Sequence, residues 1–129
     1  MISRYLTWRR IDDKIGYTGK IHPYYARYRR EKYSYLNDYR FFVGDAKYDY
    51  SKNQYNNCKL RVYKIIDNNP RKKEIVISIT MKAWTGHVKD LIDGIVAYLF
   101  MYNQNLDHSP AEIEEKFLDM IKQLDDKSY

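Results

Sequence analysis

The alternation of hydrophobic and polar positions is clearest in the second half of the chain. Residues 74–82 alternate strictly, which predicts a strand with one apolar face. Ile75, Ile77, Ile79 and Met81 are expected on one face, and Val76, Ser78, Thr80 and Lys82 on the other. A matching strand is predicted over residues 59–66, and the polar segment 67–72 between the two predicts a hairpin loop. Residues 39–43, stopped by Gly44, predict a third strand.

A C-terminal helix is indicated by three agreeing signals at its start. Ser109 can cap the helix, Pro110 suits its first position, and Glu112 completes a capping box. Apolar residues then recur with the period of an amphipathic helix. They are Ile113, Phe117, Met120, Ile121 and Leu124.

Another helix is predicted to begin at Thr85 or Gly86, with Asp90 in its first turn, where the helix dipole favours an anion. This helix is apolar nearly all round, so it should be covered on more than one side. We expect a homodimer or a partner groove on residues 87–102, with the N-terminal segment as the competing cover.

The first forty residues are ambiguous. Residues 3–11 and 23–37 suit a helix or a strand, whereas residues 15–20 look like a turn. With no internal repeat or linker, residues 1–129 are predicted to form a single α+β domain. Its expected architecture is an antiparallel sheet of three or more strands with the two C-terminal helices packed on one face.

Charge divides the chain into two parts. The formal net charge is +6. Residues 1–82 hold 19 Lys and Arg against 8 Asp and Glu, whereas residues 83–129 hold 4 against 9. A basic front favours a polyanion such as nucleic acid, an anionic membrane or an acidic protein surface, and the alternative interpretation is a merely solvated face.

Tyrosine and arginine alternate within residues 24–40, which offers stacking faces beside planar cations. This pattern predicts a binding surface for nucleic acid or for a ribonucleoprotein complex; the alternative is that half of the tyrosines belong to the core. The candidate residues of this run are Tyr24, Arg27, Tyr28, Arg29, Arg30, Lys32 and Tyr33. A second basic group on the predicted hairpin tip is Arg71, Lys72 and Lys73.

The sequence contains few signals of a catalytic, metal or cofactor site. Cys58 is the single cysteine, the three histidines are scattered, and no phosphate loop or nucleophile motif is present, so we expect no enzyme, no metal and no cofactor. Residues 49–60 begin like a calcium-binding loop but lack its glycine and glutamate. The longest apolar run, 95–102, is too short to span a bilayer, and the lone thiol fits a cytoplasmic protein.

Two resemblances bear on function. Asp90 and Asp93 on an apolar helix resemble the Holliday-junction resolvases of the RusA type, but an acid and the helical lysine of that family are missing, which implies at most a degenerate nuclease. The basic, Arg/Tyr-rich front followed by strands and helices resembles small accessory proteins of phages and mobile elements, including anti-CRISPR inhibitors. That resemblance implies non-catalytic binding to nucleic acid or to a nucleic-acid-handling complex. The remaining alternative is a structural or assembly protein with a tyrosine-rich protein-binding face.

Overall fold

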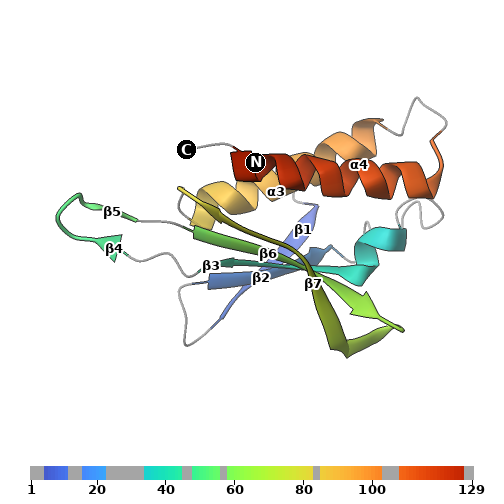
Figure 1. Cartoon of the computed structure of the whole chain (residues 1–129), viewed down its shortest axis with the longest axis horizontal. Coiled ribbons are helices and arrows are strands. Elements are labelled where there is room, and N and C mark those ends of the chain that lie inside the picture. The colour runs from blue at the N-terminus through green and yellow to red at the C-terminus, as the bar shows by residue number, and fades with distance from the viewer. Residues whose placement is uncertain are drawn as a thin grey trace.

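The computed structural model describes residues 5–11, 16–22, 34–44, 48–55, 58–82, 85–102 and 108–126. Five strands form one antiparallel sheet in the order β1-β2-β3-β6-β7. They are β1 (Leu6–Arg10), β2 (Gly16–Ile21), β3 (Tyr39–Gly44), β6 (Cys58–Ile66) and β7 (Asn69–Met81). Helices α3 (Thr85–Tyr102) and α4 (Pro110–Lys122) lie on the same side of the sheet (Figure 1). The predicted α+β architecture is confirmed.

The core lies between the sheet and the two helices. Every second strand residue faces the helices and is buried, as the alternating exposure of β3 and β6 shows. Phe41 and Tyr39 meet Phe117 of α4 edge-on, with ring centroids 6.0 and 5.3 Å apart. All three rings are buried. Because removing apolar surface from water is favourable, their burial is a main source of stability.

The predicted start of α4 is confirmed in detail. The Ser109 hydroxyl accepts a hydrogen bond from the Glu112 amide, and the Glu112 carboxylate accepts one from the Ser109 amide. Ile113, Phe117 and Ile121 are buried, as their spacing predicts. The stripe continues into η2 (Gln123–Asp126), a single turn of 3-10 helix whose Leu124 is also buried.

Helix α3 begins at Thr85 as predicted, but Asp90 is not in its first turn: it is the sixth residue and is exposed. The buried carboxylate of α3 is Asp93, whose oxygens accept hydrogen bonds from the Leu6 amide and from Nε1 of Trp8, both at 3.1 Å. Asp93 therefore fastens the edge strand β1 to α3.

The expected excess of apolar surface on α3 is largely absorbed by the core. Val88, Ile92, Val96 and Leu99 are fully buried. Tyr98 is 44% exposed. The side chains of residues 100–102 lie outside the described part of the chain, so the homodimer through residues 87–102 stays a prediction.

The hairpin between β6 and β7 is tighter than predicted. Instead of a loop over residues 67–72, the turn consists of Asp67 and Asn68, with φ values of 53° and 56°. Asp and Asn tolerate this left-handed backbone, which two-residue hairpin turns require. Strand β7 therefore begins at Asn69, and Arg71 to Lys73 belong to the strand rather than to a loop tip.

A bulge in β7 corrects the predicted placement of Ile75. Val62 pairs with Ile77 and Tyr63 pairs with Ile75, so one residue of β7 is extra. Such an insertion reverses the facing of every residue beyond it. Ile77 and Ile79 are buried, whereas Ile75 is 54% exposed.

The turn predicted over residues 15–20 is wrong, because Gly16–Ile21 is strand β2. Gly19 pairs with Trp8, and a Cβ atom at Gly19 would lie 2.5 Å from the Trp8 ring. The glycine therefore serves a close approach and not a turn. Strand β1 resolves the ambiguity of residues 3–11.

Two further short elements complete the described residues. The segment after β3 contains a small hairpin, β4 (Tyr48–Asp49) paired with β5 (Gln54–Tyr55). Ahead of β3 lies η1 (Ser34–Asp38), another turn of 3-10 helix. Residues 23–33, and with them most of the ambiguous run 23–37, lie outside the described part of the chain.

Candidate functional site

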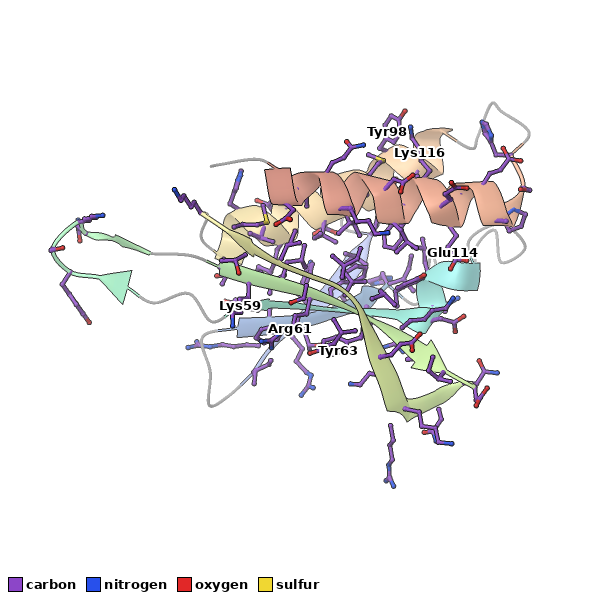
Figure 2. All side chains as sticks on the ribbon, viewed as in Figure 1. Lys59, Arg61, Tyr63, Tyr98, Glu114 and Lys116 are labelled. Carbon is purple, nitrogen blue, oxygen red and sulfur yellow. The ribbon has the colours of Figure 1, made fainter. Side chains whose placement is uncertain are left out.

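One face of the sheet is left uncovered by the helices. Strand alternation and the pairing register place one set of side chains on this side, which we call the open face. Its residues are Thr7, Arg9, Thr18, Lys20, Arg40, Phe42, Lys59, Arg61, Tyr63, Ile65, Lys73, Ile75, Ser78 and Thr80. Figure 2 shows Lys59, Arg61 and Tyr63 on one side of the sheet. Helices α3 and α4, which carry Tyr98 and Lys116, lie on the other side.

The open face is positively charged. It holds six Arg and Lys side chains on β1, β2, β3, β6 and β7, and no Asp or Glu occupies any of its described positions. The acidic residues of α4, such as Glu115 and Asp119, are exposed on the helical layer. The uneven distribution of charge along the chain thus becomes a division between the two layers of the fold, and the sheet is the layer suited to a polyanion.

Aromatic rings lie among these cations. Phe42 and Arg61 are cross-strand partners, and the guanidinium carbon of Arg61 lies 5.5 Å from the Phe42 ring centroid. Nζ of Lys73 lies 5.7 Å from the Tyr63 ring centroid. Both distances fit cation–π contacts. Phe42 and Tyr63 are half-buried, so each ring keeps part of its surface in solvent beside a positive charge.

A hollow of about 330 Å³ opens on the same side of the sheet. Its lining comes from β1, β2, β3, β6 and the first part of β7, which bends away from the helices (Figure 1). The lining residues are Thr7, Arg9, Thr18, Gly19, Lys20, Arg40, Ile65, Pro70 and Lys73. Four of the nine are cations and none is acidic, so the hollow can attract and hold an anion.

Arg40 is the most enclosed of these cations. Its guanidinium donates hydrogen bonds to the carbonyl oxygens of Asn37 and Tyr39, at 2.7 and 2.9 Å. Partial burial lowers the pKa of Arg40 from its usual value, and the nearby Asp38 opposes that shift. The carbonyls orient the side chain without neutralising it, and no described carboxylate forms an ion pair with it.

A different polar cluster joins the sheet to α4. Glu114 accepts a hydrogen bond of 2.8 Å from the Tyr39 hydroxyl and lies 3.2 Å from Nζ of Lys64. Burial of the ring, followed by the hydrogen bond to Glu114, raises the pKa of Tyr39. Because Tyr39 and Lys64 of the sheet both contact the carboxylate of Glu114 on α4, the cluster is a structural link between the sheet and the helices.

The residues predicted as a site fall into two sets. Arg71, Lys72 and Lys73 are exposed on β7, and of these Lys73 lines the hollow. Tyr24, Arg27, Tyr28, Arg29, Arg30, Lys32 and Tyr33 lie outside the described residues, so their role as a binding surface stays a prediction.

The open face itself was missed at the level of sequence. Its signal is the polar half of the strand alternation: Lys59, Arg61 and Tyr63 are interleaved with Cys58, Leu60 and Val62. The apolar positions of this alternation indicate the core, and the positions between them indicate a cationic and aromatic surface. No such local signal exists for the hollow, because its residues come together only through pairing of distant strands.

Other chemistry is sparse in the described part of the chain. Within those residues, no group of three or more His, Cys, Asp or Glu could hold a metal ion. Nor does any helix there combine the length and apolarity needed to span a membrane. Cys58 is fully buried under the helices.

No protein-family model, no curated protein and no solved structure matches this chain.

Proposed function

We propose that the open face binds single-stranded nucleic acid without catalysing a reaction. The observation that carries the proposal is the composition of this face, where cations lie beside half-buried rings and acids are absent from the described positions. Lys and Arg neutralise phosphates and release counterions, and each ring offers a surface on which a base can stack.

A single strand suits this surface better than a duplex. Bases of a duplex are stacked on each other, so their faces cannot reach Phe42 or Tyr63. A sheet that presents aromatic rings between cations is a recurrent way to bind unpaired bases in RNA-binding modules. The half-buried setting of both rings also keeps them in place, which lowers the entropy lost on binding.

The same surface would serve a protein that occupies the nucleic-acid site of a ribonucleoprotein complex. This is the role implied by the resemblance to anti-CRISPR inhibitors and other accessory proteins of mobile elements. In that case nucleic acid and the complex compete for the open face, and a bound oligonucleotide would block capture of the complex.

The test is a pair of matched charge changes on opposite sides of the molecule. Lys59→Gln/Arg61→Gln removes two cations from the open face, and Lys116→Gln/Lys122→Gln removes two from α4. Affinity for a fluorescent single-stranded oligonucleotide is measured by anisotropy over a series of salt concentrations.

The open-face variant should bind at least about tenfold more weakly, and its log–log salt slope should become shallower by about 0.7 for each phosphate that the missing cations no longer neutralise. The α4 variant should match the wild type. Equally weakened binding in both variants, or unchanged binding in both, would contradict the proposal.

A further inference from the structure

The hollow differs from the rest of the open face in how densely it collects charge. Arg9, Lys20, Arg40 and Lys73 approach one space of about 330 Å³ from four different strands. Among the described residues, none of the four forms an ion pair with a carboxylate. Like charges that lie close together repel one another, so a bound anion would relieve that repulsion.

The remaining lining sets the size and shape of the occupant. A volume of about 330 Å³ is at the small end of ligand sites, which suits one nucleotide better than a large cofactor. The hydroxyls of Thr7 and Thr18 offer hydrogen bonds to phosphate oxygens. Ile65 and Pro70 add an apolar wall against which a sugar or base can pack.

Charge separates the ends of a nucleic acid strand from its interior. An internal phosphodiester carries one negative charge, whereas a terminal phosphate monoester carries about two above its second pKa of roughly 6. Four cations around a small space favour the doubly charged group, because the attraction grows with the charge of the ligand.

We propose that the hollow is a binding site for a phosphate monoester, supplied by the terminal nucleotide of a strand bound on the open face. A nucleic acid end can supply this group only if nucleic acid binds the open face, so this source rests on the proposed function. A free nucleoside monophosphate carries the same group, and the experiment distinguishes the two sources.

One arm measures binding of a single oligonucleotide sequence with a 5′-hydroxyl, a 5′-phosphate or a 3′-phosphate. The other arm measures binding of a nucleoside 5′-monophosphate alone by calorimetry. Both arms use the wild type, Lys20→Gln/Lys73→Gln in the hollow, Lys59→Gln/Arg61→Gln on the open face, and Lys116→Gln/Lys122→Gln on α4. The lysines are chosen for the hollow because both are exposed, whereas Arg40 also holds backbone carbonyls.

A terminal phosphate should tighten binding to the wild type by about tenfold, the value of a single charge-assisted hydrogen bond. This gain should vanish in the hollow variant and persist in the α4 variant. It should also persist in the Lys59→Gln/Arg61→Gln variant, whose overall affinity is lower. Below pH 6 the gain should shrink, because the phosphate takes up a proton.

Each other result has a definite meaning. If oligonucleotides bind equally well whatever their ends, the hollow is not a monoester site, although the proposed function stands. If the gain survives in the hollow variant, the site assignment is wrong. If only the free monophosphate binds, and Lys20→Gln/Lys73→Gln abolishes it, the hollow is a free-nucleotide site and the proposed function fails.

Discussion

The guanidinium carbon of Arg61 lies 5.5 Å from the ring centroid of Phe42, its cross-strand partner on the open face of the sheet. A cation held against a ring keeps its charge available to solvent while both side chains lose mobility before any ligand arrives. Preorganisation of this kind is what a surface needs if it is to bind a flexible strand.

The rings of the open face should contribute to affinity beyond their neighbouring charges. Tyr63→Leu is expected to weaken binding of a single-stranded oligonucleotide by about 1–3 kcal/mol, because a base loses its stacking partner. Tyr98→Leu is a matched control on α3, since Tyr98 is also partly exposed but faces away from the sheet (Figure 2). Anisotropy titrations check both variants; equal effects would show that the open face has no special role.

The Arg/Tyr-rich run has its own test, since it lies outside the described residues. Arg29→Ala/Arg30→Ala is expected to weaken binding of a polyanion without lowering the melting temperature, because the density of cations beside tyrosines predicts an anion-binding surface. Gel-shift and thermal-melt measurements on one preparation check it. Unchanged affinity with an unchanged melting temperature would remove these residues from the site.

Sequence was most informative where the signals are local. The capping box at Ser109 and the apolar period of α4 depend on residues within a few positions of each other, and both were predicted correctly. Strand β2 was mistaken for a turn because Gly19 looks like a turn residue until the Trp8 ring opposite it is known. Ile75 was placed on the wrong face because a bulge depends on the register with β6.

The candidate site, too, could be predicted only where its signals are local in the sequence. A basic, aromatic partner surface was indicated by composition, and Lys73 was identified as a candidate from its basic run. Arg9, Lys20 and Arg40 are separated by long stretches of sequence and share the hollow only because β1, β2 and β3 pair side by side.

Asp93 is expected to stabilise the folded protein. Asp93→Asn should lower the free energy of unfolding by about 1–3 kcal/mol, because an amide cannot accept from both Leu6 and Trp8 as two carboxylate oxygens do. Asp90→Asn, at an exposed position three residues earlier on the same helix, is the matched control and should lower the free energy of unfolding by less than Asp93→Asn does, because water already solvates an exposed carboxylate. Urea unfolding curves decide; equal effects would contradict the role of Asp93 in fastening β1.

Stability should fall at alkaline pH through Tyr39. Burial and the hydrogen bond to Glu114 raise the pKa of Tyr39 above its ordinary value of 10.0. A group whose folded pKa is raised contributes stability that is complete below its unfolded pKa and is lost as pH rises toward the folded value. Above pH 10 the wild type should therefore lose stability more steeply than Tyr39→Phe.

At neutral pH Tyr39→Phe should itself cost about 1 kcal/mol, because Glu114 loses one donor. Thermal melts at neutral and alkaline pH measure both effects. A wild type and a Tyr39→Phe variant with parallel pH profiles would show that Tyr39 does not titrate with unfolding.

The central claim is that nucleic acid lies on the open face, and amide chemical shifts map that directly. A single-stranded oligonucleotide is titrated into isotope-labelled protein, and the perturbed amides are placed on the fold. We predict that the largest perturbations fall on β2, β3 and β6, around Thr18, Phe42 and Arg61, while the exposed side of α4 around Lys116 stays unperturbed. Perturbations centred on α4, or none anywhere at saturating oligonucleotide, would contradict the account.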